Sequence, residues 1–151
     1  KMKLIKSLSI LLFFGLAIVA TSCKKDGSTS GKTGTFSVDG VNYSGKTETQ
    51  TFVNDNYSIL CQQDDPFKFV QITFRNQAEA EAGGTFDVED YGFDIASGTV
   101  QIGTSDIITA DPTSSKTITV SGKKITIDNV KIKSTGGSGL TATINSASIN
   151  F

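Results

Sequence analysis

The side chains best suited to chemistry in this 151-residue chain lie close together between positions 87 and 94, in the run DVEDYGFD. Asp87, Glu89, Asp90 and Asp94 supply four carboxylates, and Ca²⁺ takes about six to eight oxygen ligands of this kind. The run is therefore a candidate Ca²⁺ site, although its order does not follow the EF-hand loop. The alternative is an acidic turn that stays in water and keeps the protein soluble.

Two aromatic residues, Tyr91 and Phe93, alternate with Gly92 and Asp94 in the same run. An aromatic ring beside carboxylates at the rim of a domain is suited to contact a sugar or a peptide. We expect Tyr91 and Phe93 to be ligand contacts. The alternative is that one or both rings pack into the hydrophobic core.

The composition removes whole classes of active site. The chain contains no His, which excludes Ser-His-Asp and Cys-His catalysis and His-ligated metals. It contains no Trp, which weakens the usual aromatic platform for sugars. With fifteen acidic residues, some pair always meets the carboxylate spacing of a glycosidase, so that spacing predicts nothing. We expect no enzymatic activity, and no cofactor other than the candidate Ca²⁺.

Charge is unevenly distributed along the chain. Positions 48 to 111 hold twelve acidic and two basic residues, whereas positions 112 to 151 hold five Lys and one Asp. Nucleic acid is not expected as a partner, because its phosphates attract basic surfaces. Interleaved strands would mix the two kinds of charge in space.

From position 35 onward, apolar and polar residues alternate with turn residues between them, which is typical of β-strands. The expected strands are 36–38, 41–43, 47–53, 57–62, 67–74, 85–88, 92–95, 99–102, 107–110, 117–120, 125–133 and 140–151. The Asp-Gly pair at 39–40 favours a type I′ turn, and 76–83 carries the capping residues of a short helix. A change of phase near Asn145 predicts a β-bulge.

Many short antiparallel strands favour a single β-sandwich, with a closed β-barrel as the alternative, because both architectures limit exposed edges. Val70, Ile72 and Phe74 share one face of their strand and are expected in the core. Cys61 lies in a strand-like run and is expected to be buried and unreactive.

The first 26 residues read as an export signal. Lys1, Lys3 and Lys6 form a basic head, an apolar run covers 8–20, and small residues precede Cys23. The run is shorter than the roughly 20 residues that a membrane-spanning helix needs. Positions 20–23 resemble a bacterial lipobox, which predicts cleavage before Cys23 and lipid on its sulfur. The alternative is an ordinary secretory signal cut near position 20, which leaves Cys23 as a free thiol.

The chain therefore divides into three predicted parts: a signal peptide at 1–22, a lipidated cysteine and flexible tether at 23–34, and a β-sandwich domain at 35–151. Several acyl chains on one residue give stable membrane attachment, whereas one chain gives marginal attachment. We expect Cys23 to carry palmitate and other acyl groups and to anchor the domain to the outer membrane.

The leader, the tether and the segment TFSVDGVNY at 35–43 resemble the start of small lipoproteins of Bacteroidota, whose β-sandwich domain is uncharacterised. The GTF run at 84–86 and the closing strands at 124–130 and 140–151 are similar as well. The resemblance implies a cell-envelope location and a β-sandwich, and it carries no catalytic residues. The chain is thus expected to be a binding or accessory module for a glycan, a peptide or a partner protein. The alternative is a structural envelope subunit or one associated with an adhesin or fimbria.

The lipobox prediction has a direct test. Cys23→Ala removes the sulfur that receives the lipid, so the chain should stay unprocessed or be released, and labelled palmitate should no longer enter it. The wild-type chain expressed in the same bacterium is the control. Equal incorporation of palmitate into both proteins would show that Cys23 is not the modified residue.

Overall fold

The computed structural model describes residues 31–151, and Cys23 with the predicted leader lies outside them. The described chain forms ten strands and one short helix. In chain order they are β1 (Thr33–Val38), β2 (Val41–Thr51), β3 (Tyr57–Gln63), β4 (Lys68–Phe74), α1 (Gln77–Ala82), β5 (Gly84–Val88), β6 (Thr99–Thr104), β7 (Ala110–Pro112), β8 (Thr117–Ser121), β9 (Lys124–Ser134) and β10 (Thr141–Asn150). None of the described residues belongs to a helix long and apolar enough to cross a membrane.

Nine strands close into a β-barrel in the order β10-β1-β2-β3-β4-β6-β5-β8-β9, with β9 pairing back to β10. Neighbours in this ring are antiparallel except β5 and β6, which run parallel over two residue pairs. The short strand β7 pairs with the end of β9 and is not part of the ring. The expectation of an all-β fold is confirmed. The preference for a sandwich was wrong, and the closed barrel that stood as its alternative is what the chain forms.

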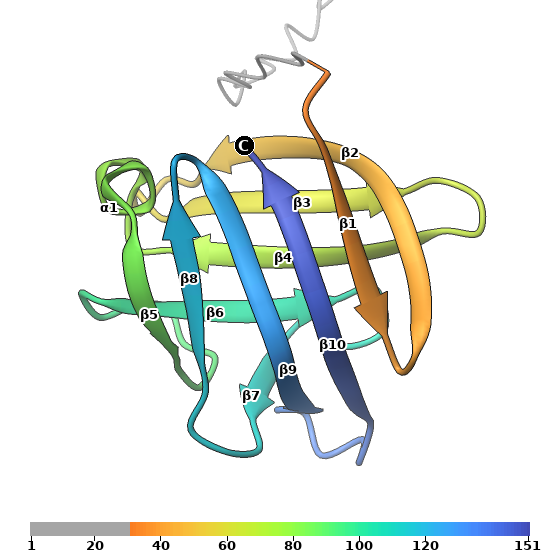
Figure 1. Ribbon diagram of the computed structural model, residues 1–151. Helices are drawn as coiled ribbons and strands as arrows, with labels where there is room; N and C mark the ends of the chain where they lie inside the picture. Colours follow the sequence, from red (N-terminus) through yellow and green to blue (C-terminus); the bar gives the residue numbers. More distant parts are fainter. Residues whose placement is uncertain (1–30) are drawn as a thin grey trace, which may run out of the picture.

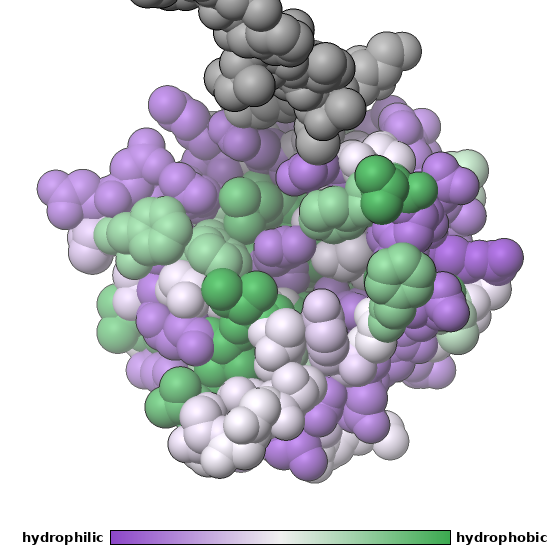
Figure 2. All heavy atoms as spheres, turned by 180° about the vertical axis from the view of Figure 1, so that it is seen from behind, coloured by the Kyte–Doolittle hydropathy of each residue, from purple (hydrophilic) through white to green (hydrophobic). Residues whose placement is uncertain are grey.

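The barrel is flattened into two layers whose strands cross (Figure 1). β5, β8, β9, β10 and β1 form the front layer, and β3, β4 and β6 run across them behind. Figure 2 is seen from behind, and therefore from the side of β3, β4 and β6. This rear layer supplies the surface on which the candidate site lies.

The long strand β2 joins the two layers. Its first half, up to Lys46, pairs with β1, and its second half, from Lys46, pairs with β3. Gly45 stands at this change of partner, where a Cβ atom would lie only 1.8 Å from the carbonyl oxygen of Gln62. A glycine inside a strand often marks such a corner, because no side chain obstructs the bend. An alternating pattern reads the same in a sandwich and in a barrel, so the pattern alone did not reveal this closure.

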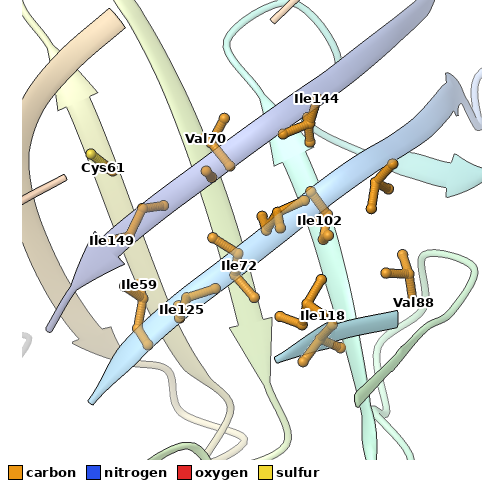
Figure 3. Close-up of a cluster of buried hydrophobic side chains, with 14 of the residues drawn as sticks. Ile59, Cys61, Val70, Ile72, Val88, Ile102, Ile118, Ile125, Ile144 and Ile149 are labelled. Carbon is orange, nitrogen blue, oxygen red and sulfur yellow. The ribbon is translucent and has the colours of Figure 1, made fainter. Parts of the chain in front are cut away.

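The interior is filled by aliphatic side chains from both layers, which point toward one another (Figure 3). Val70, Ile72 and Phe74 of β4 have no exposed surface, which confirms their predicted placement in the core. Ile125 of β9 and Ile144 of β10 meet them from the front layer and are equally buried. β4 and β8 thus contribute every second residue to this core, and β9 and β10 do so on either side of a shift in phase.

Three local predictions are confirmed. Asp39 and Gly40 both have positive φ angles, 51° and 80°, as a type I′ turn requires. Asn76 caps α1 by accepting a hydrogen bond from the backbone N–H of Glu79, at 2.8 Å. The pairing of β1 with β10 shifts register opposite Asn145, at the predicted bulge.

Cys61 is fully buried, as predicted. Burial raises the pKa of its thiol, because a thiolate is poorly solvated in an apolar interior, and this effect outweighs the hydrogen bonds that favour the charged form. The thiol therefore stays neutral and serves as a small apolar core residue.

Truncation of Ile72 tests the core assignment. Ile72→Ala leaves a cavity between the layers and should lower the free energy of unfolding by about 2–5 kcal/mol, whereas Ile72→Val should cost about 0.5–1.5 kcal/mol. Lys131→Gln, at an exposed position of β9, is the control and should stay within about 0.5 kcal/mol. Urea denaturation measures all three. A cost for Ile72→Ala no larger than that of the control would contradict the assignment.

Candidate functional site

A ten-residue connection between β5 and β6 carries the residues that the sequence singled out. Because the two strands are parallel neighbours, the chain must return along the sheet before β6 begins. The connection is held to the barrel by backbone bonds at both ends. The N–H of Glu89 donates to Val100 O at 2.9 Å, and the N–H of Asp87 donates to Gly98 O at 3.0 Å. The parallel pairing therefore places an ordered loop over β6.

Gln101 of β6 fastens this loop to the sheet. Its side-chain amide donates to the backbone oxygen of Gly92 at 3.0 Å and to Glu89 Oε1 at 3.2 Å. The other oxygen of Glu89 accepts from the hydroxyl of Thr99 at 2.6 Å. Gln101 is only 7 % exposed although it points to the outside of the barrel, because the loop covers it. Its hydrogen bonds therefore connect the loop to the sheet.

A second connection, residues 52–56 between β2 and β3, holds the same loop from the other side. The side-chain amides of Asn54 and Asn56 both donate to the backbone oxygen of Phe93, each at 3.1 Å. Asn56 is 9 % exposed, so its bond lies largely out of water. The N–H of Tyr91 donates to Asp111 Oδ1 at 3.0 Å. Side chains thus fix the backbone on both sides of the aromatic pair.

Despite these constraints on the backbone, the two aromatic side chains remain in solvent. Tyr91 is 53 % exposed and Phe93 is 74 % exposed. The alternative that they pack into the core is therefore wrong. Seen from behind, the molecule shows apolar side chains gathered on this face and polar ones around them (Figure 2).

A third connection, residues 105–109 between β6 and β7, adds a further apolar wall. It turns tightly, with Thr104 N–H donating to Ile107 O at 2.9 Å. Gly103 allows the turn to fold back, because a Cβ there would lie 2.6 Å from the carbonyl oxygen of Ile108. Ile107 consequently enters the core at 3 % exposure, while Ile108 stays 68 % exposed above the sheet.

The three connections surround a hollow of about 500 Å³ on the outer face of β4 and β6, which we call the aromatic pocket. Its walls are apolar and its floor carries amide and hydroxyl groups. It is lined by Phe52, Val53, Asn54, Asn56, Gln71, Thr73, Tyr91, Gly92, Phe93, Gln101, Ile102, Gly103 and Ile108. No residue of this lining, within the described chain, carries a charge. Its volume falls in the range of about 300–1,000 Å³ that is usual for small-molecule sites.

The four predicted metal ligands do not come together. Asp87 lies on β5, and Glu89 is engaged by Thr99 and Gln101. Asp90 is exposed, and Asp94 lines a neighbouring hollow rather than the aromatic pocket. Across residues 31–151, no three Asp, Glu, His or Cys side chains form a group that could hold a metal ion. The geometry therefore gives the calcium hypothesis no assembled ligand set.

Sequence reasoning found Tyr91 and Phe93 but missed the other walls, Phe52, Val53 and Ile108. A signal was present, because Phe52-Val53 and Ile107-Ile108 are adjacent apolar pairs, and two neighbours in an alternating pattern cannot both face the core. The predicted strands at 92–95 and 107–110 were wrong as well: the first is loop, and only position 110 of the second is strand. Side-chain hydrogen bonds, rather than a ladder, order the first segment.

Comparison with known protein families, with curated proteins and with solved structures finds no match to this chain. The pocket must accordingly be interpreted from its own geometry.

Gln101→Leu tests whether the hydrogen bonds of Gln101 hold the loop on the sheet. The substitution keeps the bulk of the side chain but leaves the Gly92 carbonyl and Glu89 Oε1 without their donor. It should lower the free energy of unfolding by about 1–3 kcal/mol and speed hydrogen exchange of the loop amides. Gln71→Leu is the matched control, because the Gln71 amide has only a long contact of 3.5 Å with Thr73. Equal small effects of the two substitutions would show that Gln101 does not hold the loop.

Proposed function

We propose that this protein is a lipid-anchored module of the cell envelope that acts by binding an uncharged ligand in the aromatic pocket. The observation that carries the proposal is the exposure of Phe93 at 74 % on a backbone fixed by two asparagine amides. Exposed apolar patches of this kind commonly mark sites of interaction. The ligand would be a glycan, a peptide or a segment of a partner protein.

Preorganisation supports a binding role. A loop that is already ordered loses little conformational entropy when a ligand arrives, so more of the contact energy appears as affinity. Tyr91 and Phe93 each have few rotatable bonds, which keeps that cost low at the side chains as well. The pocket therefore presents aromatic side chains on a backbone that is already held in place.

The residues around the pocket support binding rather than catalysis. Its lining holds amides, one threonine hydroxyl, one phenol and apolar side chains. General acid–base or nucleophilic catalysis needs a titratable group within hydrogen-bond reach of the reacting atoms, matched to the working pH. Among residues 31–151, the only titratable side chain in the lining is that of Tyr91, and a lone phenol is a weak basis for either mechanism.

The proposed location rests on the leader, namely the basic head, the apolar run and the lipobox-like residues before Cys23. A lipid on Cys23 would hold the barrel at the outer membrane through the tether at 23–34. The barrel itself favours a binding module over the adhesin or fimbrial alternative. Each of its nine strands has a neighbour on both sides, so the ring presents no wholly unpaired strand edge to another chain.

Arrays of glycans and of peptides test the proposal. The full chain, purified in a zwitterionic detergent that contains no sugar, should give signals that Phe93→Ala abolishes. Phe67→Ala is the matched control, because Phe67 is 59 % exposed but does not line the pocket. Signals on neither array, or signals that Phe93→Ala leaves intact, would contradict a binding role for the pocket.

A further inference from the structure

We infer that the ligand of the aromatic pocket is a neutral saccharide, whose ring face lies against Phe93 or Tyr91 while its hydroxyl groups meet the floor of β4 and β6. The inference rests on the proposed function and narrows it from an uncharged ligand to one chemical class. Four properties of the pocket lead to it: the absence of charge in its lining, the polar floor, the exposed aromatic walls, and the pairing of β4 with a neighbouring strand on each side.

The lining explains why the ligand is uncharged. A charged group that leaves water needs an opposite charge or a set of hydrogen bonds directed at it, and without them its desolvation opposes binding. Every described residue that lines the pocket is neutral at pH 7. An acidic ligand would in addition meet exposed Asp90 and Asp94 on the same loop. Acidic saccharides and phosphorylated ligands are therefore disfavoured.

The floor explains why the ligand is not simply apolar. Gln71 and Thr73 of β4 and Gln101 of β6 lie side by side on the outer face, where Gln101 is paired with Thr73 across the two strands. The amide hydrogens of Gln101 are used by Gly92 and Glu89, which leaves its oxygen to accept from a ligand. Gln71 offers an acceptor oxygen and an amide group whose only side-chain contact among the described residues is the long one to Thr73. A purely apolar ligand would dehydrate these groups without replacing their hydrogen bonds.

The apolar walls of the pocket suit the C–H faces of a sugar ring. A pyranose carries hydroxyl groups around its edge and C–H groups on its faces. The face of an aromatic ring is electronegative and attracts such polarised C–H groups, while both surfaces gain by leaving water. Phe93 and Tyr91 stand exposed on the loop, with Phe52 on the opposite connection. The arrangement of apolar walls around an amide floor thus matches a molecule with apolar faces and a hydroxylated edge.

The pairing of the strands argues against a peptide. An extended peptide commonly binds a sheet by adding a strand to a free edge, so that its own backbone groups find partners. β4 pairs with β3 on one side and with β6 on the other. A peptide over this face would have to satisfy its backbone with a few side-chain amides. The hydroxyl groups of a saccharide both donate and accept, and they are satisfied by single amide groups.

Isothermal titration of the full chain, in the same detergent, with neutral hexasaccharides of glucose, xylose and mannose tests the inference. Oligogalacturonate of the same length is the acidic comparison. We expect at least one neutral hexasaccharide to bind, with a Kd at least about tenfold higher for Phe93→Ala and clearly higher for Gln71→Leu. Phe67→Ala should leave the Kd within about twofold. Circular dichroism of each variant establishes that it is folded.

The outcomes separate this inference from the proposed function. Three results would overturn the inference that the ligand is a neutral saccharide. They are no binding of any neutral hexasaccharide at millimolar concentration, equal binding by Phe93→Ala, and equally tight binding of oligogalacturonate. If a peptide on the array binds in a Phe93-dependent manner and no saccharide does, the inference fails while the proposed function stands. If neither array nor titration gives a Phe93-dependent signal, both fail.

Discussion

Closure of the sheet is the constraint on which the rest of this structure depends. β9 and β10 pair over nine residue pairs, and β10 also pairs with β1, so the last strand of the described chain joins the first. Every strand must then turn one face to a single interior, which sets the alternation of apolar and polar residues around the ring. Closure also brings β5 beside β6 in parallel, and the connection that this requires is the loop that carries Tyr91 and Phe93.

The exposure of the aromatic pair follows from two opposing demands. Burial of a phenylalanine side chain is worth about 1.5–3 kcal/mol, so an isolated loop would tend to turn Phe93 inward. The space beneath is already filled by Val100 and Ile102, at 0 % and 3 % exposure, and a close-packed interior does not admit another ring. Hydrogen bonds from the side-chain amides of Asn54 and Gln101 to the loop backbone hold the loop in place above that core. The ring is left in water because both the interior and the backbone are fixed.

Sequence reasoning succeeded where the cause was local. The Asp-Gly turn, the helix cap at Asn76 and the bulge at Asn145 each depend on residues close to one another in the chain or in a paired strand, and the alternation identified the core face of β4. It failed where the cause was distant. The walls of the aromatic pocket come from three connections that only the barrel brings together. The side-chain amide of Gln101 likewise donates hydrogen bonds to residues nine and twelve positions earlier. The alternation of apolar and polar residues along a strand indicates neither the closure of the barrel nor the convergence of these three connections.

Acidic residues stand around the aromatic pocket, and two of them, Asp90 and Asp94, were predicted as metal ligands. Asp55, Asp90 and Asp94 lie on the connections that form the pocket, yet none of them lines it, and all three are exposed. Carboxylates at this rim repel the same rim on a second copy, which counteracts the tendency of an exposed apolar patch to associate with itself. A neutral ligand carries no net charge for these carboxylates to attract, so they would contribute little to holding it. The rim charges therefore oppose self-association through the apolar patch, whereas the proposed selection of a ligand rests on the neutral lining.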